Sequence, residues 1–101
     1  MLKKGMTKCR KIVLRVLPGN ESRLEPFVEQ CLRDGVKLIA VMGDNCARIE
    51  DIIDELVVGD GSHKGRFILT SSHPDEGLES VISFATTLPG EYEGEVEVVE
   101  L

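Results

Sequence analysis

The alternation of short extended runs with helix-period segments constrains this chain more than any other feature. Extended runs recur along the 101 residues, at positions 11–17, 37–42, 66–71 and 94–101. The segments between them space their apolar residues at helical intervals, at positions 22–34, 44–58 and 74–88. Strands that alternate with helices form a parallel sheet with helices packed on its faces. The sequence therefore predicts one α/β domain.

Residues with known capping roles mark the ends of the first expected helix. Gly35 stops it, as a glycine just beyond a helix often does. Its start has two alternatives. Ser22 and Glu25 can form a capping box, or Pro26 can occupy the first helical position.

The second and third expected helices each carry an apolar stripe that should face the sheet. In the second helix, which Asp44 or Asn45 caps, the stripe is Ile49, Ile52, Ile53, Leu56 and Val57. In the third helix, which Pro89 ends, the stripe is Leu78, Val81, Ile82 and Ala85. Each helix is therefore expected to bury one face only.

The fourth extended run differs from the other three, which are apolar on both faces. Its glutamates, Glu95 and Glu97, alternate with Val96 and Val98, so one face of this strand meets water. Such a strand belongs at an edge of the sheet. We therefore predict a three-layer α/β/α fold with three helices and a four-stranded, mostly parallel sheet in the flavodoxin-like order 2-1-3-4.

This strand order predicts uneven cover of the sheet. The first helix would lie alone on one face, while the second and third would share the other. Part of the first face, over strands three and four, would then lack a helix. Either residues 1–10 fold over it or a second copy of the chain does, and an uncovered apolar face is a recognised interaction surface. We therefore expect a homodimer, or a second protein as partner.

Charge is distributed unevenly along the chain. The net charge of −6 excludes a general nucleic-acid binder, which needs a basic surface. The basic residues near the start are Lys3, Lys4, Lys8, Arg10, Lys11 and Arg15. The acidic residues near the end are Glu91, Glu93, Glu95, Glu97 and Glu100. We separate a basic segment, 1–10, from a domain at 11–101, and the two charge clusters either stay solvated or attract each other.

The cysteines and the apolar runs bear on the cellular compartment. Cys9, Cys31 and Cys46 are an odd set without a C-x-x-C pair, which is typical of a reduced, cytoplasmic protein. No apolar run approaches the roughly 18 residues of a membrane span, and the first residues lack the apolar core of a secretory signal. We expect a cytoplasmic protein that does not bind membranes.

Polar residues gather where the expected strands end. In open parallel sheets, ligands bind beyond the carboxyl ends of the strands at the point where the strand order reverses, here between the loops after strands one and three. The candidate ligand-binding residues on these loops and the one after strand two are Asn20, Asp44, Asn45, Ser71, Ser72 and His73. We predict that any ligand site lies on this edge.

The segment around His73 has two interpretations. In one it starts a helix, with Pro74 at the first helical position and Asp75 and Glu76 beside the positive helix end. In the other, His73 acts as acid, base or metal ligand, and Asp75 orients it. The first interpretation assigns no chemistry to the segment.

Cys46 is the remaining candidate for chemistry. It lies near the expected start of the second helix, where a thiolate is favoured, but it also suits a buried core position. A zinc site from His73, Cys46 and Asp75 lacks a close-spaced ligand pair. The sequence contains no Walker A loop, no dinucleotide fingerprint and no G-x-S-x-G elbow. We therefore assign no catalytic residue, metal or cofactor.

Two stretches of the chain resemble a family of short bacterial proteins known only as a domain of unknown function. The first is Gly43-Asp44-Asn45-Cys46 with Glu50-Asp51-Ile52-Ile53-Asp54. The second is Arg66-Phe67-Ile68-Leu69-Thr70, His73, Asp75-Glu76, Leu78-Glu79-Ser80-Val81 and Phe84-Ala85. The family often has a tryptophan near the position of Ile49 and another before the histidine, and this chain has neither. The resemblance implies a small cytoplasmic α/β domain without an established activity or cofactor, and it centres on the loops with Cys46, His73 and Asp75.

These observations support one leading functional hypothesis and one alternative. The leading hypothesis is a binding or protein-interaction module without catalysis. The alternative is a small enzyme or metal-dependent hydrolase that uses His73, Asp75 and Cys46 at the strand ends.

Overall fold

The computed structural model describes residues 9–59 and 67–101, apart from the side chains of Cys9 and Glu91. The strands are β1 (Cys9–Arg15), β2 (Val36–Met42), β3 (Leu69–His73) and β4 (Gly94–Glu100). The α-helices are α1 (Leu24–Asp34), α2 (Cys46–Val58) and α3 (Leu78–Thr87), and short 3-10 turns occur at Glu21–Arg23 and Gly90–Tyr92. In these ranges, no helix combines the length and apolar character needed to cross a membrane.

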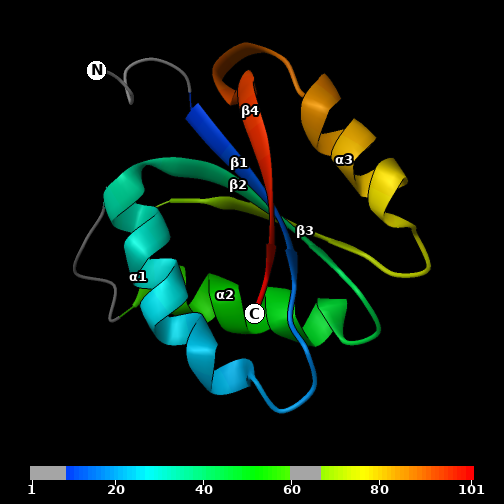
Figure 1. Ribbon diagram of the computed structural model, residues 1–101. Coiled ribbons are helices and arrows are strands. Elements are labelled where there is room, and N and C mark those ends of the chain that lie inside the picture. The colour runs from blue at the N-terminus through cyan, green and yellow to red at the C-terminus, as the bar shows by residue number, and fades with distance from the viewer. Residues whose placement is uncertain (1–8, 60–66) are drawn as a thin grey trace.

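The four strands form one parallel sheet in the order β3-β2-β1-β4. This confirms the predicted α/β class, the four parallel strands and the three helices. It also confirms that the last strand lies at an edge of the sheet (Figure 1). The hydrogen bonds from Leu101 N to Arg15 O, at 2.8 Å, and from Leu17 N to Leu101 O, at 3.0 Å, extend the pairing of β1 and β4 beyond both strands.

The predicted order 2-1-3-4 was wrong in its neighbours. It placed strand three beside strand one, whereas β2 separates them and β4 pairs with β1. The physical reason is burial, because six of the seven residues of β2 are buried, as an inner strand requires. β3 contains Thr70, Ser71 and Ser72, which suit an edge strand. The apolar start of the predicted strand, Phe67, lies before β3 with 63% of its surface exposed.

The corrected order also changes which helices share a face. The chain moves in one direction from β1 to β2 to β3, so α1 and α2 lie on the same face and contact each other. It then crosses back past β2 and β1 to reach β4, and α3 packs alone on the opposite face (Figure 1). The prediction that one helix covers a face by itself holds, but that helix is α3 and not α1.

Two apolar cores lie on the two faces of the sheet. The first, under α1 and α2, includes Ile12, Leu14, Leu24, Val28, Ile39, Val41, Cys46, Ile49, Ile53 and Val57. The second, under α3, consists of Val13, Leu38, Ala40, Met42, Val81 and Ala85. The smaller second core reflects the single helix on that face, and the predicted three-layer arrangement is confirmed.

The helix starts differ from the predicted ones. Pro26 is the third residue of α1, and no side-chain hydrogen bond caps the helix. Pro74 and Asp75 form a turn after β3, and α3 begins only at Leu78. Asp75 has a positive φ of 66°, a conformation that aspartate tolerates in turns. The interpretation of Pro74 as the first helical residue was therefore wrong, because this turn delays the helix.

The basic start and the acidic end of the chain meet where the inner strand β1 pairs with the edge strand β4. Arg10 forms ion pairs with Glu97 of β4 and, at 3.1 Å, with Asp34 at the end of α1. Arg15 lies 3.6 Å from Glu100. Within residues 9–59 and 67–101, these pairs support mutual attraction of the two charged segments, while Lys3, Lys4 and Lys8 lie outside the described residues. The same applies to the predicted cover of the sheet by residues 1–10, of which only Cys9 and Arg10 are described, as part of β1.

A buried lysine joins β1 to the last turn of α3. Lys11 is fully buried, and its Nζ donates a 2.6 Å hydrogen bond to the carbonyl oxygen of Ala85. Carbonyls in the last turn of a helix lack partners within the helix, and a cation there also complements the helix dipole. Lys11 therefore holds α3 against the sheet.

Replacing Lys11 by methionine should lower the free energy of unfolding by about 1–3 kcal/mol, because the buried Ala85 carbonyl loses its partner. Methionine keeps a long unbranched side chain, so the loss reports the hydrogen bond more than the packing. Lys37→Met on the exposed position of β2 is the matched control. Urea unfolding at equilibrium measures both variants, and equal stability of Lys11→Met and the parent chain would contradict this role.

Candidate functional site

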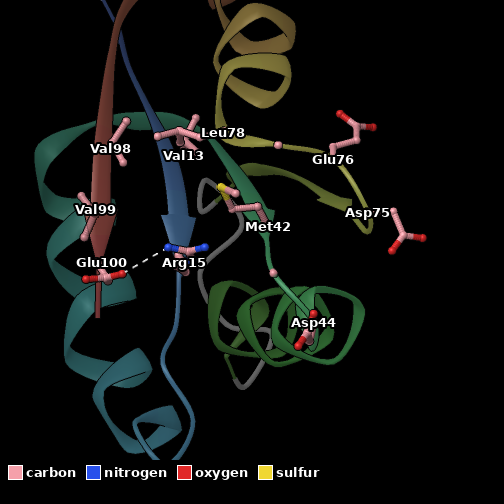
Figure 2. A pocket seen from close by; sticks show the side chains of 12 residues that line it. Val13, Arg15, Met42, Asp44, Asp75, Glu76, Leu78, Val98, Val99 and Glu100 are labelled. Carbon is pink, nitrogen blue, oxygen red and sulfur yellow. Dashed lines mark ion pairs between the residues drawn. The ribbon is translucent and has the colours of Figure 1, made fainter.

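A cavity of about 520 Å³ opens at the carboxyl ends of the strands, on the face that α3 covers. In the order 3-2-1-4, the strand order reverses between β1 and β4, and ligands of open parallel sheets bind at that point. The sequence had predicted a ligand site between the loops after strands one and three. The observed strand order moves the expected site to the ends of β1 and β4. We refer to this cavity as the strand-end pocket (Figure 2).

The strand-end pocket combines an apolar wall with a charged rim. The apolar side chains are Val13, Met42, Leu78, Val98 and Val99. The charged side chains are Arg15, Asp44, Asp75, Glu76 and Glu100, and Gly43 and Gly77 complete the lining. Leu78 and Val98 are 43% and 49% exposed, so apolar surface is open to a ligand here. The volume lies in the range of small-molecule sites.

Carboxylates outnumber the arginine on the rim. Arg15 lies 3.6 Å from Glu100, and Figure 2 shows the two side chains facing each other at the ends of β1 and β4. In the same view, Asp44 extends from the start of the loop after β2, and Asp75 and Glu76 lie on the outer loop before α3. Since Arg15 is paired with Glu100, the rim as a whole is acidic.

The structure divides the predicted site residues into two groups. Asp44 and Asp75 line the strand-end pocket. The residues that do not line it are Asn20, Asn45, Cys46, Ser71, Ser72 and His73. Asn20 lies in the turn after β1, and Asn45 precedes α2 as its N-cap residue. The loop after β1 therefore contributes nothing to this pocket.

The cysteines of the helices are core residues. Cys46 is 2% exposed and Cys31 is 4% exposed, and both are free thiols. Burial raises the pKa of Cys31 to about 11, with a further rise from Asp34 and an opposing effect of Arg10. The interpretation of Cys46 as a small buried hydrophobe fits its position better than that of a reactive thiolate.

His73 lies at the end of β3 with 7% of its surface exposed. Its Nε2 is 2.8 Å from Ser71 Oγ, and its Nδ1 is 3.3 Å from Glu76 Oε1. The ring packs against Phe84 of α3, with 4.6 Å between the ring centroids. The acidic partner of His73 is thus Glu76, rather than the predicted Asp75. The turn at Pro74 and Asp75 lets Glu76 approach the ring.

The residues considered for a zinc site, to which no metal was assigned, do not converge. Cys46 belongs to the core under α1 and α2, whereas His73 packs against α3 on the other face. In the described part of the chain, no three His, Cys, Asp or Glu side chains are grouped so as to hold a metal ion. The metal-dependent form of the hydrolase alternative therefore has no ligand set here.

Several residues of the strand-end pocket were missed from the sequence, namely Val13, Arg15, Met42, Leu78, Val98 and Glu100. Leu78 was expected to face inward, but it is the first residue of α3 and lies beyond the end of the core. The strand pattern did indicate that Val13 and Arg15 share one face of β1, because they alternate with Ile12 and Leu14. Without the pairing of β1 and β4, these positions could not be joined into one site.

These features define a small parallel α/β protein with a half-open pocket at the strand ends. The chain belongs to the family described as Domain of unknown function (DUF7684), whose model matches residues 5–100. Comparison with curated proteins and with solved structures gave no match. The family membership confirms the resemblance noted in the sequence.

At pH 8, Cys31 and Cys46 in the folded protein should react with iodoacetamide at least about 100-fold more slowly than in concentrated urea, because they are buried and the raised pKa of Cys31 leaves little thiolate. Peptide mass spectrometry after timed quenching measures each site separately. Rapid labelling of Cys46 in the folded protein would contradict its assignment to the core and would make Cys46 a candidate reactive thiol again.

Proposed function

We propose that this protein is a binding module whose strand-end pocket takes a small organic cation with an apolar body. The observation that carries this proposal is the composition of the pocket, an apolar wall beneath an acidic rim. No catalytic group is needed for this function.

The apolar wall supports a ligand with a hydrophobic body. Val98 and Leu78 are about half exposed in the free protein, and they flank Val13 and Met42, which are buried in the core under α3. A ligand that covers Val98 and Leu78 removes apolar surface from water, which contributes about 25 cal/mol per Å². This term would supply most of the affinity.

The rim supports a positive charge on the ligand. Asp44, Asp75, Glu76 and Glu100 line the pocket together with a single arginine, and Arg15 already faces Glu100. An anion would meet this excess of carboxylates, whereas a cation is attracted by it. Exposed charge pairs contribute only about 0.2–1 kcal/mol each. The rim therefore selects for the sign of the ligand's charge more than it adds affinity.

The same charge argues against a second copy of the chain as the occupant of the pocket. A symmetric dimer through this face would bring two acidic rims together, and like charges oppose such contact. The predicted homodimer stays a prediction and would need another surface. Light scattering over a range of protein concentrations tests the homodimer.

We also propose a cytoplasmic location, which the free thiols Cys31 and Cys46 support.

A matched set of three probes tests the pocket. Phenethylamine, 2-phenylethanol and 3-phenylpropionate share an aromatic body and differ in charge. We expect phenethylamine, at millimolar concentration, to shift the NMR methyl signals of Val13, Met42 and Val98, with 2-phenylethanol weaker and 3-phenylpropionate weakest. Equal binding of the amine and the carboxylate would contradict the proposed selection by charge.

The double variant Asp44→Asn/Glu100→Gln should weaken phenethylamine binding by about 3- to 10-fold, because two attractive carboxylates are lost and Arg15 is freed. The control variant Glu55→Gln/Glu95→Gln removes the same charge away from the pocket and should bind like the parent chain. Calorimetry or NMR titration at low and high salt measures both. Equal weakening in the two variants would show a non-specific charge effect.

A further inference from the structure

A serine, a histidine and a glutamate lie next to one another beside α3. Of the three, only the glutamate also lines the strand-end pocket. Ser71 Oγ lies 2.8 Å from His73 Nε2, and His73 Nδ1 lies 3.3 Å from Glu76 Oε1. The imidazole therefore stands between a hydroxyl and a carboxylate, each at a different ring nitrogen. We refer to these three residues as the Ser71 cluster.

The partners of His73 determine how its protons are distributed. A carboxylate can only accept, so the ring proton of a neutral His73 is favoured on Nδ1, facing Glu76. In that tautomer Nε2 is an acceptor, and the Ser71 hydroxyl, 2.8 Å away, is placed to donate to it. This is the arrangement in which a histidine removes the proton from a serine nucleophile.

Packing and hydrogen bonding hold the cluster in place. The His73 ring packs against the Phe84 ring at a tilt of 58°, which limits rotation of the imidazole. Glu76 Oε1 also accepts a 3.1 Å hydrogen bond from Ser80 Oγ in α3. Both the base and the group that orients it are thereby fixed by a neighbouring helix, as an activated nucleophile requires.

Ser71 is reachable from outside. It is half-buried on β3, which is an edge strand of the described sheet (Figure 1). The edge of such a strand presents backbone N–H groups without sheet partners, and donors of this kind stabilise a developing oxyanion. Leu69, two residues earlier and partly buried in the core under α3, and Phe84 give the site apolar surroundings.

From this geometry we infer that Ser71 is a nucleophile for acyl transfer, with His73 as general base and Glu76 as the residue that positions His73. The apolar neighbours indicate a carboxylic ester with an apolar acyl group as substrate. This inference does not require cation binding in the strand-end pocket, with which the Ser71 cluster shares only Glu76.

The reaction balances without a cofactor. Ser71 Oγ forms a bond to the ester carbonyl carbon while its proton passes to His73 Nε2. The bond from that carbon to the alcohol oxygen then breaks, and Nε2 returns the proton to the departing alcohol. Water attacks the acyl-serine with Nε2 as base, which releases the carboxylic acid and restores the Ser71 hydroxyl.

An alkyl fluorophosphonate tests the nucleophile, because serine oxygen displaces fluoride from phosphorus and leaves a stable adduct. Incubation of the intact protein, followed by peptide mass spectrometry, should place the adduct on Ser71. Ser71→Ala should abolish it. Ser72→Ala, on the adjacent residue with its side chain on the other face of β3, should react like the parent chain.

His73→Gln should slow labelling by at least about 100-fold, the usual contribution of a general base. Because His73 is buried, circular dichroism must show that this variant is folded. Glu76 is exposed at the surface, so Glu76→Gln gives a second test with little risk to folding. It should slow labelling about 10- to 100-fold, and Glu76→Asp should restore part of the rate.

Hydrolysis of p-nitrophenyl butyrate gives a second readout. We expect kcat to fall in Glu76→Gln with little change in KM, and the pH dependence of kcat to change with it, which a purely structural role would not produce. Absence of any adduct on Ser71 in the folded parent chain would overturn the inference. So would equal labelling in Ser71→Ala and the parent chain, or rates in Glu76→Gln that match the parent.

Discussion

The pairing of the first and last strands is the constraint on which the rest of this structure depends. β1 lies between β2 and β4, and the ladder to β4 continues through Leu101 to Leu17. Parallel strands need a long connection, so this pairing can form only after the chain has crossed the whole sheet. The ion pairs of Arg10 with Glu97 and of Arg15 with Glu100 reinforce the register, although exposed pairs of this kind contribute little each. Backbone hydrogen bonds and the burial of β1 on both faces must therefore supply most of the stability.

The same pairing explains why the open surface lies where it does. A sheet whose strands run 3-2-1-4 uses two helices for the first two crossings and one for the return, so α3 has a whole face to cover. Lys11 fixes the end of α3 over the start of β1, and the opposite end of the face stays open. The two faces of β4 therefore differ in how much of their side chains is exposed. Val99 packs against the core under α1 and α2, whereas Val98, on the α3 face, is 49% exposed. The strand-end pocket is the result of one helix being too little cover for four strands.

The sequence predicted what depends on local patterns and failed where distant segments had to be matched. Apolar periodicity located all three helices and four strands, and the glutamates of residues 94–101 correctly predicted an edge strand. The strand order was wrong because the run from Arg66 was read as a buried strand, although Thr70, Ser71 and Ser72 already indicated an edge. Asp44 and Asp75 were found because polar residues at strand ends are a local signal. Arg15 and Val98 were missed because their proximity depends on a pairing between residues far apart in the chain.

The turn before α3 decides the chemistry of the segment that contains His73. Had the helix begun at Pro74, Glu76 would have been in its first turn, where a carboxylate serves the helix dipole. The left-handed conformation of Asp75 instead delays the helix to Leu78, and the carboxylate of Glu76 reaches His73 Nδ1. A buried imidazole needs polar partners for its nitrogens, and Ser71 Oγ lies 2.8 Å from Nε2 while Glu76 Oε1 lies 3.3 Å from Nδ1. The turn thus removes the proline start of α3 and brings the Glu76 carboxylate to the imidazole that also contacts the Ser71 hydroxyl.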